Sequence, residues 1–491
     1  MAASIRKNWF YNTLLTGLNI IFPLLSFPYA SRLLGPEGIG SVGFAQSLVN
    51  NFIFIACLGI PLYGTREIAR VKNDPEQLNR TFSELLLVNI CAMLLAFLCY
   101  TVLIFMVPRF YEKRVLYFVF AFSLVSSVWS YDWLFRGMEN FRFIAGRTAV
   151  IKLLSLALLF ILVKKPGDYI RYALITVFSQ SAANLLNFFA GRKIVRFTFN
   201  NLSVYRHLKF IFISFFMGIT VKLYGEMDKI MTGLISGEKY VGYYSLAEKA
   251  IRLQIAAASS FSAVLLPRMS YFSSMGMADD FSRLIDKSVK FMLLSLLPLA
   301  VFTGIFSDQI AILLGGSGFF PAALTLRILS GMLFFSGFAN LTGLQVLYAS
   351  GREKHYLISV AAGMIMALAL NFLLIPRYQQ NGAALGTLAA EAAGCLIQII
   401  FGWSMLKNSL LQKSNIKYFA ALLPAAAAGL YIRFLLVSGI LPAFFSSAGM
   451  VFSFGISGAG FVYLLALLLV NEPISRGIFR AITCKISIYY N

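Results

Sequence analysis

Long apolar segments recur along the whole chain and are separated by short polar connections. A helix needs about 20 apolar residues to cross the hydrocarbon core of a bilayer, and most of these segments have that length. The pattern therefore predicts an all-α integral membrane protein with about fourteen transmembrane helices. The predicted spans are 9–30, 39–63, 84–107, 115–135, 148–163, 170–190, 210–235, 241–266, 291–314, 322–349, 356–375, 382–406, 418–439 and 447–470.

Composition supports a membrane protein and excludes a soluble domain of this length. Hydrophobic residues make up 59% of the 491 residues, charged residues only 13%, and the mean hydropathy is +0.77. The net charge is +22, from 42 Lys and Arg against 20 Asp and Glu. Most basic residues lie between apolar segments, so we expect the anionic membrane surface as their partner and no nucleic acid.

The basic residues also predict an orientation. With a cytoplasmic N-terminus, the inside segments carry 26 Lys and Arg and the outside loops carry 9, with Arg171 at the edge of span 170–190 counted as outside. Cytoplasmic loops are enriched in Lys and Arg, so both termini and the segment 191–209 are predicted to be cytoplasmic. A multi-pass arrangement in the membrane is expected.

The chain contains a weak internal repeat at an offset of 202 residues. The run LLGPEGIGSVGFAQ at Leu33–Gln46 matches SGEKYVGYYSLAE at Ser236–Glu248, with Gly35 on Gly237 and Gly40 on Gly242. Six spans per repeat predict two parallel six-helix halves, residues 1–208 and 209–407. The remaining residues, 408–491, then form two extra C-terminal helices and a tail. Glycine and alanine are common in membrane spans, so a chance match stays open.

Four runs carry a family resemblance: YASRLLGPEGIGSVGFAQS at 29–47, TREIA at 65–69, DKIMTGLISGEKYVGYYSLAEK at 228–249 and VLLPRMS at 264–270. They resemble Wzx-type polysaccharide flippases of the multidrug/oligosaccharidyl-lipid/polysaccharide (MOP) exporter superfamily. The resemblance implies a location in the bacterial cytoplasmic (inner) membrane. It also implies alternating access that moves an undecaprenyl-diphosphate-linked oligosaccharide from the cytoplasmic to the outer leaflet, for O-antigen, capsule or exopolysaccharide. It also implies polymerase and chain-length proteins of the same pathway as partners. No cofactor is expected beyond a coupling ion, H⁺ or Na⁺.

Charged residues inside the predicted spans mark the candidate site. A charge at mid-bilayer costs about 2.5–3.5 kcal/mol on insertion scales, so these residues must pair or face water. The proposed substrate-binding residues of a cationic cavity are Lys222, Lys249, Arg252 and Arg32. The candidates for charge pairs or ion coupling are Glu226, Asp228, Lys229, Glu248 and Glu391. Purely structural pairing, as in Lys222–Glu226 and Glu248–Arg252, stays open.

Two other classes remain as alternatives: a cation-coupled multidrug antiporter of the same superfamily and a membrane polysaccharide polymerase. An antiporter should present acidic residues to its cargo, yet basic residues outnumber acidic ones within the spans. A polymerase usually needs a large outside loop or paired catalytic groups, and the outside loops are short. We therefore expect no enzyme, no catalytic residues and no metal site.

Overall fold

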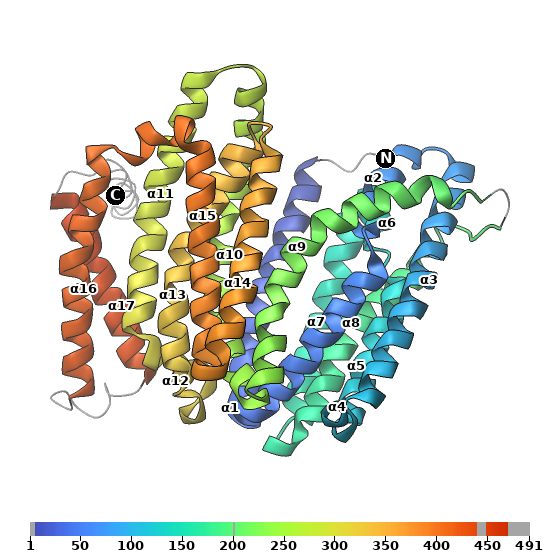
Figure 1. The fold of residues 1–491 in the computed structure, drawn as a ribbon, viewed down its shortest axis with the longest axis horizontal. Coiled ribbons are helices and arrows are strands. Elements are labelled where there is room, and N and C mark those ends of the chain that lie inside the picture. The colour runs from blue at the N-terminus through green and yellow to red at the C-terminus, as the bar shows by residue number, and fades with distance from the viewer. Residues whose placement is uncertain (1–4, 200–201, 439–447, 470–491) are drawn as a thin grey trace, which may run out of the picture. The chain divides into compact units, whose positions relative to one another are not determined.

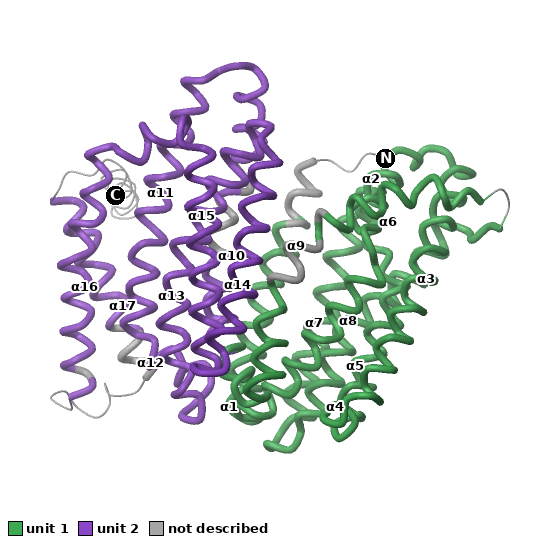
Figure 2. Tube along the Cα trace, viewed as in Figure 1, with its two compact units in different colours: residues 1–245 green, residues 246–491 purple. Residues whose placement is uncertain are grey.

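The computed structural model describes residues 5–199, 202–438 and 448–469, and within this part of the chain the structure is helical without a strand (Figure 1). Side chains of some helical stretches, such as 219–224, lie outside the description. The chain forms two compact units, residues 1–245 and 246–491 (Figure 2). The predicted halves with a boundary at 208 stay a prediction.

In residues 5–199 and 202–245, unit 1 holds nine α-helices, two short 3-10 helices and the start of a tenth α-helix. These are α1 (Ile5–Cys57), α2 (Ile60–Val71), α3 (Pro75–Met106), α4 (Pro108–Glu112), α5 (Arg114–Ser126), η1 (Ser127–Trp129), α6 (Asp132–Gly137), α7 (Phe141–Leu162), η2 (Pro166–Asp168), α8 (Tyr169–Gly191), α9 (Tyr205–Ile235) and α10 (Glu238–Ser274).

Unit 2 continues α10 and then adds seven α-helices with three short elements, one of them a π-helix, within the described residues. These are α11 (Ala278–Ile305), α12 (Ser307–Gly315), η3 (Ser317–Phe319), α13 (Ala322–Ala339), the π-helix η4 (Asn340–Tyr348), α14 (Glu353–Tyr378), α15 (Gln380–Leu410), η5 (Lys413–Asn415), α16 (Ile416–Val437) and α17 (Ala448–Leu469).

The first two predicted spans form one element that breaks at a glycine. α1 has 53 residues, which would extend about 80 Å as a straight helix and far exceed a bilayer. Gly35 interrupts it with φ 68° and ψ −179°. Glycine adopts this backbone without steric cost, so the chain changes direction here (Figure 1). The two segments of α1 correspond to spans 9–30 and 39–63.

The other predicted spans also fall on described helices, and the prediction of an all-α membrane protein is confirmed. Among the described residues, ten segments are long and apolar enough to cross a membrane. One of them, 13–71, contains span 39–63 and most of span 9–30. Residues 439, 447 and 470 of the last two predicted spans lie outside the described residues. The total of fourteen stays a prediction.

Exposed apolar side chains cover the outside of the helices. On α3, Leu94, Leu95, Leu98, Val102, Phe105 and Met106 are all exposed. A soluble protein rarely exposes so large an apolar stripe, whereas lipid tails solvate it well. Polar groups on the same helix lie near its N-terminal end, where Asp74 caps the helix by accepting hydrogen bonds from the backbone N–H of Glu76 and Gln77.

Candidate functional site

The two copies of the internal repeat share a special backbone conformation. Gly35 has φ +68° at the break in α1, and Gly237 has φ +114° in the turn between α9 and α10. These are the glycines that the offset of 202 places on each other. Residues with a Cβ rarely adopt either conformation, so glycine serves the same purpose in both copies, as the point where a helix pair turns.

Residues 36–40 and 238–242 pack against each other in a reciprocal way. A Cβ on Gly40 would overlap the backbone carbonyl of Glu238, and a Cβ on Gly242 would overlap the backbone carbonyl of Pro36. Residue 36 plus 202 is 238, and 40 plus 202 is 242, so the two contacts are equivalent under the repeat. Reciprocity of this kind is the property of a two-fold interface. Small residues allow helix backbones to approach this closely.

A buried ion pair lies beside this glycine contact. Lys113 Nζ donates to Glu238 Oε2 at 2.6 Å and to Ser41 Oγ at 3.1 Å, and the Ser41 hydroxyl also donates to Glu238. The Glu238 side chain is only 7% exposed. A buried carboxylate is stable only when its hydrogen-bonding capacity is met, so this cluster connects α1, α10 and the start of α5. The sequence prediction did not include Lys113 or Glu238, because no spacing along the chain relates them.

The acidic candidates on α9 take two different environments. Glu226 is partly buried; it accepts hydrogen bonds from Ser47 Oγ at 2.7 Å and Asn50 Nδ2 at 3.4 Å, and Lys229 Nζ lies 3.4 Å away. Asp228 is buried and accepts a hydrogen bond from the Tyr244 hydroxyl at 2.7 Å.

These contacts place Asp228 on a different face of α9 from Glu226 and Lys229, as a turn of 100° per residue requires. The Glu226 group, consisting of Ser47, Asn50, Glu226 and Lys229, combines hydroxyl, amide, carboxylate and ammonium groups on the second segment of α1 and on α9. Such groups can bind sugar hydroxyls or exchange a proton.

The candidates in unit 2 differ in their contacts and burial. Arg252 Nε donates to Glu248 Oε1 at 2.6 Å, and the Glu248 side chain is 6% exposed while that of Arg252 is 49% exposed. The predicted Glu248–Arg252 pair is therefore present. Glu391 accepts a hydrogen bond from Ser336 Oγ at 2.8 Å. Lys249, which follows Glu248 on α10, is half-buried.

Two of the predicted candidates remain, Arg32 and Lys222. Arg32 is exposed near the end of the first segment of α1, just before Gly35. The side chain of Lys222 lies outside the described residues, so the predicted Lys222–Glu226 pair does too. The roles of all nine candidates in binding or coupling stay predictions.

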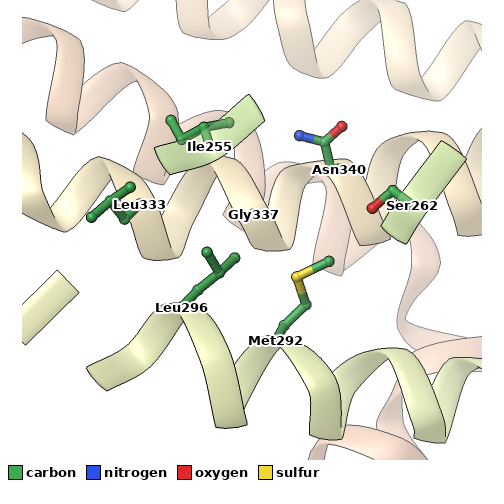
Figure 3. A pocket seen from close by; sticks show the side chains of 7 residues that line it. All are labelled: Ile255, Ser262, Met292, Leu296, Leu333, Gly337 and Asn340. Carbon is green, nitrogen blue, oxygen red and sulfur yellow. The ribbon is translucent and has the colours of Figure 1, made fainter. Parts of the chain in front are cut away.

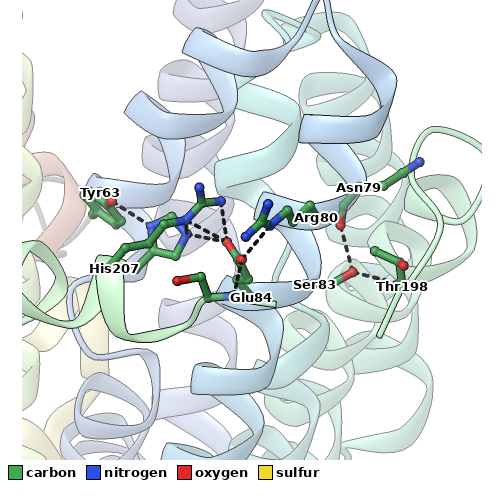
Figure 4. Close-up of polar contacts among 9 residues, drawn as sticks. Tyr63, Asn79, Arg80, Ser83, Glu84, Thr198 and His207 are labelled. Atoms are coloured by element: carbon green, nitrogen blue, oxygen red, sulfur yellow. Dashed lines mark hydrogen bonds and ion pairs between the residues drawn. The ribbon is translucent and has the colours of Figure 1, made fainter. Parts of the chain in front are cut away.

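A second buried carboxylate, Glu84, organises the start of α9 (Figure 4). It is fully buried and accepts hydrogen bonds from Arg206 Nη2 at 2.6 Å, Arg80 Nε at 3.1 Å and the backbone N–H of Ser203 at 2.6 Å. The His207 ring nitrogen Nε2 lies 2.8 Å from the same carboxylate, and Nδ1 lies 2.7 Å from the Tyr63 hydroxyl.

Burial lowers the pKa of His207, which favours a neutral ring. A neutral ring that donates to Glu84 can accept the hydrogen bond of Tyr63. His207 lies in the first turn of α9. This group ties the segment before α9 to α3, so we assign it a structural role.

Unit 2 contains a small enclosed space between α10, α11, α13 and η4 (Figure 3). Its walls are apolar apart from Ser262 and Asn340, and Gly337 allows Leu296 to pack against α13. The lining carries no charge. This space is therefore part of the packing between helices and not a site for a charged cargo.

The fold defines the class of protein. The chain superposes on the lipid II flippase MurJ in an inward closed conformation with a TM-score of 0.74, at 15% sequence identity, over 95% of this chain and 99% of that chain. It also superposes on an inward-facing multidrug resistance MATE family transporter of the MOP superfamily, with a TM-score of 0.63 at 15% identity, over 80% of this chain and 96% of that chain. The chain has the fold of MOP superfamily transporters and is a multi-pass membrane protein.

The family follows from the sequence comparison. The family described as "Polysaccharide biosynthesis protein" matches residues 5–273, more than half of the chain. The chain belongs to this polysaccharide biosynthesis protein family, which confirms the predicted resemblance.

Individual relatives agree with this family. The "Putative O-antigen transporter" of Escherichia coli (strain K12) is 27% identical over 427 residues, 83% of this chain and 98% of that protein. The lipid II flippase MurJ of Bacillus subtilis (strain 168) is 22% identical over 470 residues, 83% of each chain.

Proposed function

We propose that this protein is a flippase that moves a lipid-linked oligosaccharide from the cytoplasmic to the outer leaflet of the bacterial cytoplasmic membrane by alternating access. The cargo proposed from the family is an undecaprenyl-diphosphate-linked repeat unit of a surface polysaccharide. Family membership and the names of the relatives support the cargo class. No chemical step on the sugar is part of the proposal, so the protein acts as a transporter and not as an enzyme.

One structural observation supports the mechanism more than any other. The Glu226 group lies at about 14 Å from the C-terminal end of α9, if each residue rises 1.5 Å. The two helix segments that carry this group, the second segment of α1 and α9, also lead to the glycine contact and the buried Lys113–Glu238 pair. A polar site at membrane depth next to a tightly closed helix contact is what one closed state of an alternating-access carrier requires.

The proposed cycle uses the glycine contact as the closed end. With the predicted orientation, Gly35 and Gly237 lie in outside turns, so this contact closes the outer side. Opening would separate the 36–40 and 238–242 backbones and break the Lys113–Glu238 pair. A protonated or ion-bound carboxylate among Glu226, Asp228 and Glu391 is the proposed coupling group, because each is an intramembrane acid.

Deletion of the gene tests the function. We expect the lipid-linked repeat unit to accumulate on the cytoplasmic leaflet and the surface polymer to disappear, with both defects reversed by the plasmid-borne gene. The measurement is the accessibility of the lipid-linked sugar to an impermeant glycosidase, together with the amount of surface polymer. Normal surface polymer combined with new drug sensitivity would support the antiporter instead.

A further inference from the structure

A cavity of about 630 Å³ opens in unit 1 between α3, η1 and the end of α8. This volume is within the range of about 300–1,000 Å³ that small-molecule sites occupy. All its lining residues belong to unit 1, and none belongs to the Glu226 group or to the glycine contact. The lining residues are Phe82, Leu86, Ile90, Val128, Trp129, Tyr131, Phe188, Arg192, Val195, Arg196 and Phe197.

The lining has an unusual chemistry for a cavity. Nine of its residues are aliphatic or aromatic and two are arginines, and none of the described lining residues is a carboxylate, an amide or a small hydroxyl residue. Apart from the two guanidiniums, its side chains offer only the Trp129 indole N–H and the Tyr131 hydroxyl for hydrogen bonds, which is few for an oligosaccharide. A hydrocarbon chain that ends in a negatively charged group fits both parts of the lining.

The arginines and the neighbouring aromatic residues have the features of a membrane interface. Arg192 is exposed and its guanidinium lies 5.4 Å from the ring centre of Phe188. Beyond Arg196, the rings of Phe197 and Phe199 pack edge to face at 4.7 Å, and Phe199 is 78% exposed. Aromatic rings beside basic side chains concentrate at the level of lipid headgroups.

The wall that carries Arg196 is held in place. The backbone N–H of Arg196 donates to Asn79 Oδ1 at 2.7 Å. The backbone N–H of Thr198 donates to Ser83 Oγ at 2.9 Å (Figure 4). Both acceptors are on α3. The segment is therefore positioned before any ligand arrives, which lowers the entropy cost of binding.

We propose that this cavity binds an anionic glycerophospholipid of the membrane, with the phosphate at Arg192 and Arg196 and one acyl chain among Phe82, Trp129 and Phe188. The segment 191–209 is predicted to be cytoplasmic, and basic pockets on that side of membrane proteins take anionic headgroups. The site is separate from the proposed transport route. It makes a lipid of the surrounding bilayer a ligand of the first unit, whatever cargo the protein carries.

Trp129 is a built-in reporter of occupancy, because an acyl chain bearing bromine quenches a tryptophan that it touches. The purified full chain is reconstituted in phosphatidylcholine with increasing amounts of brominated phosphatidylglycerol, or of brominated phosphatidylcholine. Trp129→Phe protein gives the background from the other tryptophans. We expect the Trp129-dependent quenching to saturate at a low fraction of phosphatidylglycerol, and to require much more brominated phosphatidylcholine.

The charge variants test the headgroup contact. Arg192→Gln/Arg196→Gln should weaken the preference for phosphatidylglycerol roughly thirtyfold, since each basic residue near an anionic lipid contributes about a factor of five. The matched control Lys193→Gln/Lys209→Gln removes the same charge from exposed positions outside the lining and should keep the preference.

Three results would overturn the proposal. Equal quenching by the two brominated lipids would remove the headgroup preference, and an equal loss in the control variant would reduce it to general surface charge. Reversal of the phosphatidylglycerol quenching by polyprenyl diphosphate equimolar with the protein would assign the cavity to the cargo carrier. The deletion experiment does not depend on any of these results, so the two proposals fail separately.

Discussion

At the scale of single residues, buried charge in this protein is matched by specific partners. Glu84, Glu238 and Glu248 are all buried, and each accepts a hydrogen bond from at least one basic side chain. A buried carboxylate that loses its partner costs several kcal/mol or takes up a proton. Charged residues inside the membrane therefore divide into those held by a pair and those exposed to a cavity, and variants can separate these two groups.

The Glu248–Arg252 pair gives a prediction about stability. Arg252→Ala leaves the buried Glu248 carboxylate without this donor, and we expect protein abundance to fall and the free energy of unfolding to drop by about 1–2 kcal/mol. The value is below the 3–5 kcal/mol of a fully buried pair, because Arg252 is half-exposed and water screens it. The double variant Glu248→Gln/Arg252→Gln should recover abundance, measured by in-gel fluorescence of a tagged protein.

Recovery of transport separates the two roles of this pair. If transport also returns in the double variant, Arg252 has only a structural role and leaves the list of substrate-binding candidates. If abundance stays low in the double variant, the pair does not explain the loss.

Lys249 gives the corresponding prediction about transport. We expect Lys249→Gln to lower export of the surface polymer several-fold at normal abundance, because an ammonium at a diphosphate cargo supplies a charge-assisted hydrogen bond that the amide does not. Lys287→Gln is the control, since Lys287 is an exposed lysine of the same unit, on α11. Equal export by both variants would exclude contact between Lys249 and the cargo.

At the scale of helices, the internal repeat has a mechanical consequence. The start of α10 and the second segment of α1 touch through Gly40 and Gly242, and each glycine faces a backbone carbonyl that no side-chain rotation can move away. Overpacking such a contact costs about 1–3 kcal/mol. The contact can be lost only by separating two helices, which makes it suited to open and close as a unit.

Alanine at either glycine tests this contact. Gly40→Ala and Gly242→Ala should each destabilise the closed contact by about 1–3 kcal/mol, so that Asn50→Cys, near Glu226, is labelled faster by an impermeant maleimide from outside. Gly146→Ala is the control, because a Cβ there meets open space. Labelling in both test variants at the rate of the control would show that this contact does not close the outer side.

At the scale of the whole molecule, the chain combines an apolar surface for lipid with polar groups on selected helices. The exposed stripe of α3 and the similar exposed residues Ile365, Phe372 and Leu373 of α14 need a bilayer. The strongly basic composition then sets which side each loop takes, since basic loops resist translocation. Orientation is therefore a property of the complete chain and not of one helix.

Single-cysteine labelling tests the orientation. In a protein without its five natural cysteines, we expect an impermeant maleimide to label Gln379→Cys from outside and to label Lys193→Cys only after the cells are opened. Both positions are exposed, so the difference reports the side of the membrane and not burial. Labelling of Lys193→Cys in intact cells would reverse the predicted topology.

The amino-acid sequence by itself determined the elements, the class and the charged candidates of this protein. Bilayer thickness fixes the length of an apolar helix, so hydropathy alone predicts membrane spans. A turn of 100° per residue is enough to place Asp228 on a different face from Glu226 and Lys229. The repeat could also be found, because a positive φ requires glycine at both Gly35 and Gly237.

Only the tertiary structure decided which distant residues meet. Lys113 pairs with Glu238 across 125 positions, and Glu84 binds Arg206 across 122. The cavity at Trp129 likewise combines residues from α3 to the segment after α8. Hydropathy and helical periodicity act over one or two turns, whereas these partners are chosen by helix packing, which brings together side chains that no local pattern relates.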